Sequence, residues 1–131
     1  MRNDVEVTNP DDIKWSQSRT APSGCWGKPI YRYDEDRLGN IGRAGPYTTL
    51  YRFEPGSFYR PIIVRDQAIE IFVISGVLAI DDVEVGEGSW ARILPTVNPI
   101  VLGSILGSEI VAIVRGRVEL GENDANFGEQ K

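Results

Sequence analysis

The stretch PGSFYRPIIVRDQAIEIFVISG, from Pro55 to Gly76, decides the fold. β-branched and aromatic residues dominate from Phe58 to Val64 and again from Ile69 to Ser75, and these are the residue types that strands favour. The polar segment RDQA separates the two runs and has the composition of a turn. This stretch therefore predicts two β-strands joined by a short connection.

Short apolar runs with strand character continue on both sides of this hairpin, separated by Gly, Pro, Asp and Asn. None of them has the 3.6-residue periodicity of an amphipathic helix. Many short strands at near-regular spacing predict an all-β sandwich, barrel or jelly roll. The predicted strands are Tyr47–Glu54, Phe58–Val64, Ile69–Ser75, Val77–Ile80, Val83–Val85, Ser89–Leu94, Ile100–Ile105 and Glu109–Leu120.

The chain of 131 residues has the length of one domain with a hydrophobic core of its own. Residues 1–46 are polar and rich in turn residues, so we expect an irregular N-terminal arm that packs on the barrel or on a partner subunit. Residues 47–120 form the expected barrel. Residues 121–131 are expected to be a flexible tail.

Composition and charge exclude several classes of function. The net charge of −5 and pI of about 4.7 argue against a nucleic-acid partner, because proteins that bind nucleic acid carry a basic face. No stretch approaches the roughly 20 apolar residues of a membrane span, and the first ten residues lack the apolar core of a signal peptide. We expect no membrane partner and a cytoplasmic location.

Cys25 is the single cysteine, and the chain has no histidine. A catalytic thiol needs a base to activate it, and the usual base is missing. We therefore expect Cys25 to be a small buried structural residue.

Six features stand out along the chain: Trp15, KPIYRYDED, TTLYRFEPG at Thr48 to Gly56, EIFVISG at Glu70 to Gly76, GEGSWARILP at Gly86 to Pro95, and the closing strand. Together they resemble the cupin family, and more narrowly the single-domain cupins grouped with anti-sigma-factor cupin domains and acetylacetone dioxygenase. The resemblance covers about Ile13 to Leu120. It implies a cupin double-stranded β-helix, a small jelly-roll barrel, and a homodimer.

The same resemblance implies where metal ligands would stand. The two histidines of the first cupin motif fall at Ile62 and Val64, its glutamate at Ile69, and the histidine of the second motif at Pro99 or Asn98. Isoleucine and valine have no lone pair to donate, and Asn98 alone could not hold a transition metal. We therefore expect no metal and no cofactor, and we set aside the dioxygenase activity that the resemblance would imply.

Alternation along the strands predicts which side chains face the barrel interior. If Ile62 and Val64 point inward, Phe58 and Arg60 share their face, and Ile69 and Ile71 face them from the next strand. Arg60 keeps its charge, so in the interior it could anchor the carboxylate, enolate or phenolate of a small molecule. Alternatively, it could lie at the barrel mouth in a surface ion pair.

Two further strands carry candidate ligand contacts. Tyr51 and Phe53 share a face with Tyr47, and Tyr51 could be a hydrogen-bond donor or general acid. We assign Tyr47 to the core or to a subunit interface, and the same assignment stays open for Tyr51. Trp90 and Arg92 could clamp a planar ligand, or Ala91 and Ile93 could be the inward pair instead.

The hypothesis favoured by these residues is a metal-independent enzyme that binds a small, aromatic or polyketide-like molecule. Its chemistry would be a non-redox isomerisation, cyclisation, dehydration or lyase step. The alternatives are a non-catalytic binding or sensory cupin, and a structural cupin whose cavity is filled. The candidate site comprises Arg60 and Tyr51 as catalytic residues and Phe53, Phe58, Ile62, Val64, Ile69, Ile71, Trp90, Arg92 and Asn98 as binding residues.

Overall fold

A computed structural model describes residues 4–17, 22–32 and 46–120. Strands make up almost all of the regular structure in these ranges, and the helical content is a single 3-10 turn, η1 (Pro10–Asp12). The expected all-β class is confirmed. In the described part of the chain no helix is long and apolar enough to cross a membrane.

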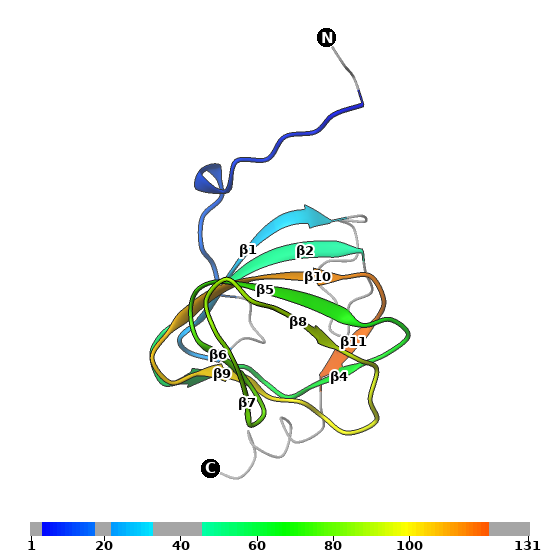
Figure 1. The fold of residues 1–131 in the computed structure, drawn as a ribbon. Coiled ribbons are helices and arrows are strands. Elements are labelled where there is room, and N and C mark those ends of the chain that lie inside the picture. The colour runs from blue at the N-terminus through cyan, green and yellow to red at the C-terminus, as the bar shows by residue number, and fades with distance from the viewer. Residues whose placement is uncertain (1–3, 18–21, 33–45, 121–131) are drawn as a thin grey trace.

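A five-stranded antiparallel sheet forms one wall of the molecule (Figure 1). Each of its strands is antiparallel to its neighbours, so residues on one face alternate with residues on the other. In spatial order the strands are β1 (Cys25–Arg32), β2 (Tyr47–Phe53), β10 (Ser108–Val114), β5 (Ile69–Gly76) and β8 (Trp90–Ile93).

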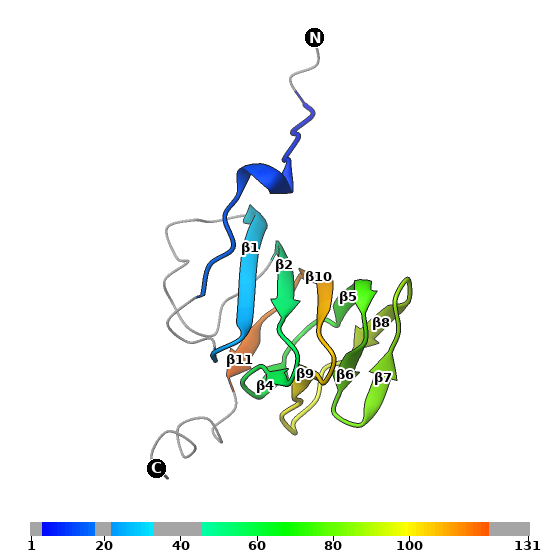
Figure 2. The same ribbon diagram turned by 90° about the vertical axis from the view of Figure 1, so that its left-hand side faces the viewer.

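Two smaller sheets lie opposite and close the barrel, as the two views show (Figures 1 and 2). The first is a four-stranded sheet in the order β3 (Ser57–Phe58), β9 (Leu102–Ser104), β6 (Leu78–Ile80) and β7 (Val83–Val85). The second pairs β4 (Ile62–Val64) with β11 (Val118–Leu120).

The hydrophobic core fills the space between these sheets. Along β10, Ile110, Ala112 and Val114 are buried and alternate with half-buried residues, which is the pattern of a sheet with one face inward. Ile71 of β5 lies opposite Ala112 in the ladder and is fully buried. The inward face of the large sheet is therefore hydrocarbon along its central strands.

The strand expected from Phe58 to Val64 is interrupted, and this changes which residues face inward. The backbone N–H of Tyr59 donates to Leu102 O at 2.7 Å, and that of Ile62 donates to Ile100 O at 2.9 Å. The three residue steps from Tyr59 to Ile62 therefore lie opposite two steps, from Leu102 to Ile100. The extra residue makes a β-bulge, which reverses the alternation of inward and outward side chains. Pro61 lies in the bulge and has no N–H to pair. The strand expected from Glu109 to Leu120 is likewise divided, into β10 and β11.

The N-terminal arm is more ordered than expected, because Cys25–Arg32 forms strand β1 at the sheet edge. The sequence did not predict this strand because it contains Gly27 and Pro29, which are uncommon within strands. Edge strands tolerate proline where central strands do not. Before β1, two cations lie over the ring of Trp15, with Lys28 Nζ 4.8 Å and the Arg52 guanidinium carbon 4.6 Å from its centroid. This part of the arm packs on its own barrel. Residues 33–45 of the arm and the expected tail, 121–131, lie outside the described residues.

Candidate functional site

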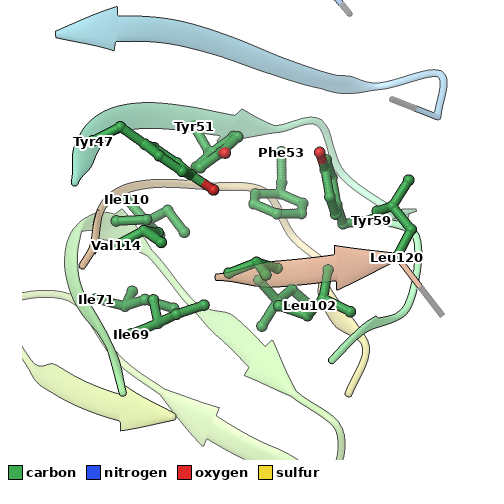
Figure 3. A pocket seen from close by; sticks show the side chains of 13 residues that line it. Tyr47, Tyr51, Phe53, Tyr59, Ile69, Ile71, Leu102, Ile110, Val114 and Leu120 are labelled. Carbon is green, nitrogen blue, oxygen red and sulfur yellow. The ribbon is translucent and has the colours of Figure 1, made fainter. Parts of the chain in front are cut away.

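One pocket opens into the barrel between the large sheet and the β4–β11 pair (Figure 3). The pocket has a volume of about 70 Å³. This volume is less than half of the roughly 150 Å³ of a cavity that binds benzene, so a ring bound here would also occupy the open side of the pocket. The lining residues are Tyr47, Tyr51, Phe53, Tyr59, Ile62, Ile69, Ile71, Leu102, Ile110, Ala112, Val114, Val118 and Leu120.

The polar side-chain groups among these lining residues are three phenol hydroxyls, from Tyr47, Tyr51 and Tyr59. Figure 3 shows the three rings along one side of the pocket, with Ile69 and Ile71 on the opposite side. The Tyr51 and Tyr59 rings meet edge to face, with centroids 5.9 Å apart. The three tyrosines are half-buried, whereas the two isoleucines are buried. The hydroxyl-bearing side is therefore the side nearer to solvent.

Five of the residues expected in the site come together in this pocket. They are Tyr51 and Phe53 from β2, Ile62 from β4, and Ile69 and Ile71 from β5. Val64 is buried in the core beside them, opposite Val118 of β11, but outside the lining. Tyr47, assigned from sequence to the core or an interface, is part of the lining instead.

Phe58 and Arg60 do not share the pocket face of Ile62, and the bulge at residues 59–62 is the reason. Phe58 is 45% exposed and its ring covers Gly103, where a side chain would collide with it. Arg60 is half-buried and is not among the lining residues. The reversed alternation places Tyr59 inward, and strict alternation from the sequence could not find it.

Trp90, Arg92 and Asn98 also lie away from the pocket. In the β5–β8 ladder Trp90 stands opposite Phe72 and Ala91 opposite the buried Ile71, so Ala91 rather than Trp90 faces inward. Trp90 is 62% exposed and packs on the Phe72 ring with centroids 4.9 Å apart. Arg92, opposite Glu70, is exposed on the same outer face.

Asn98 lies in the loop between β8 and β9, where its backbone N–H donates to Thr96 Oγ1 at 3.2 Å. Its side chain is exposed. Neither Asn98 nor Pro99, the two positions considered for the second-motif histidine, is among the lining residues.

The residues of the pocket do not fit a divalent transition metal. Such metals take imidazole, thiolate or carboxylate donors, and no His, Cys, Asp or Glu is among the lining residues that the structure describes. Within the described ranges no three residues of these types gather closely enough to hold an ion. Ile62 and Ile69, which stand where ligands are expected, present hydrocarbon to the cavity.

Cys25 lies at the end of β1, outside the pocket lining, and is 2% exposed. Burial raises the pKa of its thiol from 9.0 to about 11, against a hydrogen bond with Ser57 that lowers it, and the nearby Glu54 carboxylate raises it further. A thiol with this pKa stays protonated at neutral pH. The expectation of a structural rather than nucleophilic cysteine agrees with this environment.

Comparison with solved structures identifies the architecture. An RmlC-like cupin protein of Ralstonia eutropha JMP134 superposes with a TM-score of 0.71 at 14% identity, covering 92% of this chain and 74% of that one. An acetylacetone dioxygenase of Acinetobacter johnsonii gives 0.69 at 10% identity, covering 94% and 81%. The polyketide cyclase RemF of Streptomyces resistomycificus gives 0.62 at 18% identity, covering 95% and 93%.

No protein-family model and no curated protein sequence matches the chain. The likeness is therefore one of structure, and it shows that this chain has the cupin fold, as the sequence resemblance implied. The expectation of a homodimer stays a prediction.

Proposed function

Starting from the cupin fold of the chain, we propose that the barrel binds a small, aromatic or polyketide-like molecule and promotes a non-redox step on it. The reaction would be an isomerisation, cyclisation, dehydration or lyase step. The observation that carries this proposal is a hydrocarbon pocket with three tyrosine hydroxyls on one side. Such a lining combines apolar contact area with a few directed polar groups, as small-molecule sites do.

Tyr51 and its neighbours can support catalysis by hydrogen bonding. When a carbonyl compound enolises or is attacked at its carbonyl carbon, negative charge develops on the oxygen. A phenol hydroxyl aimed at that oxygen stabilises the charge more in an apolar pocket than in water. The pocket walls can also hold a flexible chain in the folded conformation that ring closure requires.

Proton removal is the step for which the described lining has no obvious group. It contains no carboxylate or imidazole, so water or an oxygen of the substrate must accept the proton. This favours reactions in which the substrate is already acidic or carries its own base. RemF, a protein of the same fold, is a polyketide cyclase, which supports ring closure as one such reaction.

A second candidate is a carrier or sensor that binds the molecule without converting it. The lack of a carboxylate or imidazole among the described lining residues favours this candidate, and the pocket would serve both functions equally well. The cavity itself argues against the third hypothesis, a barrel filled by its branched side chains, because Ile62 and Ile69 leave open space between the sheets.

Turnover separates the two candidates. The experiment is to screen small aromatic ketones and linear polyketide mimics by thermal shift, then incubate each binder with the protein and quantify product by mass spectrometry. An enzyme converts a binder faster than buffer does, and the Tyr51→Phe variant loses that rate. A carrier returns the molecule unchanged. If none of these compounds binds, the proposal is contradicted.

A further inference from the structure

We infer that the pocket selects ligands that are electrically neutral and carry a hydrogen-bond acceptor, such as a ketone, a quinone or an undissociated phenol, and that it rejects carboxylates, phosphates and phenolates. This inference deepens the proposed function and rests on it. It departs from the sequence-based idea that Arg60 anchors an anion, because Arg60 is not among the lining residues.

The charged residues on the lining strands occupy the alternate, outward positions. Glu70 lies between the lining residues Ile69 and Ile71, and its carboxylate is 3.1 Å from Arg115 Nη1. Arg52 lies between the lining residues of β2 and stacks over Trp15.

The β4–β11 pair repeats this arrangement. Glu119 lies between the lining residues Val118 and Leu120, and its carboxylate is 3.1 Å from Arg65 Nη2. Each of these charges is thus turned away from the cavity and engaged with a group on the outer side.

A permanently charged ligand would lose hydration in this pocket without gaining a counter-charge from the described lining. Burying an unpaired carboxylate carries a large desolvation penalty even after the surroundings relax. The net charge of −5 adds an unfavourable field for anions. Neutral hydroxyl donors suit a reaction in which negative charge appears only in the transition state. The neutral ligand then enters the pocket with little loss of hydration free energy, and the hydroxyls stabilise the charge as it develops.

The positions of the polar groups also predict the orientation of the ligand. Tyr47 and Tyr51 project from β2 and Tyr59 from the bulge, all on one side of the cavity, whereas Ile69 and Ile71 form the other side (Figure 3). The acceptor oxygen should face the tyrosines, and the hydrocarbon part of the ligand should lie against β5. Because the volume of about 70 Å³ is smaller than a benzene cavity of roughly 150 Å³, a ring in this orientation would extend into the open side of the pocket.

The pair 4-nitrophenol and 4-nitroanisole tests the charge preference. Both probes have one ring of nearly the same shape, but only 4-nitrophenol ionises, and its anion absorbs at a different wavelength from the neutral form. We expect the protein to bind neutral 4-nitrophenol, so that the apparent Kd rises about tenfold for each pH unit above the pKa of the probe. The Kd of 4-nitroanisole should stay constant between about pH 5 and pH 9, which controls for titration of the protein.

The variants Tyr51→Phe and Tyr31→Phe locate the binding. Tyr51→Phe should lower the affinity for both probes. Tyr31→Phe alters a residue of β1 outside the pocket and should change the affinity for neither probe. Binding of the anion with equal or higher affinity, seen in the absorption of the bound probe, would overturn the inference and leave the proposed function standing. If neither probe bound at any pH, the proposed function itself would fail and the inference with it.

Discussion

Tyr51 and Tyr59 meet edge to face inside the barrel, with ring centroids 5.9 Å apart and ring planes at 63°. Tyr51 belongs to the large sheet, and Tyr59 to the bulge between β3 and β4 on the opposite sheets. Their contact joins the two walls at the half-buried side of the pocket. The same two rings therefore close the barrel wall and supply hydroxyls to the site.

Removing one hydroxyl from this pair should affect ligand binding more than folding. We expect Tyr51→Phe and Tyr59→Phe each to lower the affinity for a neutral aromatic ketone about fivefold, because one neutral hydrogen bond contributes about 1 kcal/mol. The ring contact survives in phenylalanine, so the free energy of unfolding should change by no more than about 1 kcal/mol. Calorimetric titration and urea unfolding measure the two effects, with Tyr31→Phe as the control.

Arg60→Gln should leave ligand affinity within about twofold of the original protein, since its side chain is not among the lining residues. The comparison with Tyr51→Phe in the same titration is informative because both residues are catalytic candidates by sequence. A loss for Arg60→Gln as large as that for Tyr51→Phe would show that the guanidinium reaches the ligand. The neutral-ligand inference would then be wrong.

The protein should not retain a transition metal. After incubation with zinc, iron, nickel or manganese and desalting, we expect less than about 0.1 equivalent per chain, because the described part of the lining provides no imidazole or carboxylate. Chelator treatment should leave the affinity for 4-nitroanisole unchanged. Elemental analysis that found one equivalent, lost in step with ligand binding, would contradict this expectation.

Sequence patterns predicted much of the barrel because its strands are short, apolar and bounded by turn residues. Ile69 and Ile71 are buried as alternation requires, and the hydrocarbon at Ile62 and Ile69 does face the cavity. The prediction failed where the alternation itself changes. The bulge at Pro61 turned Phe58 outward and Tyr59 inward, and no residue-by-residue count can place such a break without the partner strand.

The second failure has a different cause. Trp90 and Arg92 were candidates because aromatic and guanidinium groups often bind ligands, yet the face they occupy is set by pairing with β5. The buried Ile71 fixes Ala91 as the inward residue, and Trp90 follows outward. Register between distant strands is therefore the information that the sequence alone lacked.

Ile69 lines the cavity, so shortening its side chain should enlarge the cavity and widen the range of ligands. We expect Ile69→Ala to lower the free energy of unfolding by about 2–4 kcal/mol and to let a two-ring ketone such as 2-acetylnaphthalene bind. Leu78→Ala is the matched control, since Leu78 is fully buried but lies outside the lining. It should cost similar stability without changing the preference for one-ring over two-ring ketones in the titration. An unchanged preference in Ile69→Ala would show that the ligand binds elsewhere.

Stability should fall in alkaline solution because of Cys25. The folded protein holds its thiol protonated up to a pKa of about 11, while the unfolded chain releases that proton near 9.0. Below pH 9.0 both states carry the proton and this contribution to stability is complete. As the pH rises from 9.0 to about 11 it is lost, and the free energy of unfolding drops by up to about 1.4 kcal/mol per pH unit.

Cys25→Ala isolates this effect from the titration of lysine and tyrosine, which both proteins share. Urea unfolding at a series of pH values should show a steeper alkaline decline for the original protein than for the variant. In parallel, iodoacetamide should label Cys25 slowly in the folded state, because the thiol is buried and protonated. Equal alkaline slopes together with fast labelling would show that the thiol is accessible and titrates as it does in the unfolded chain.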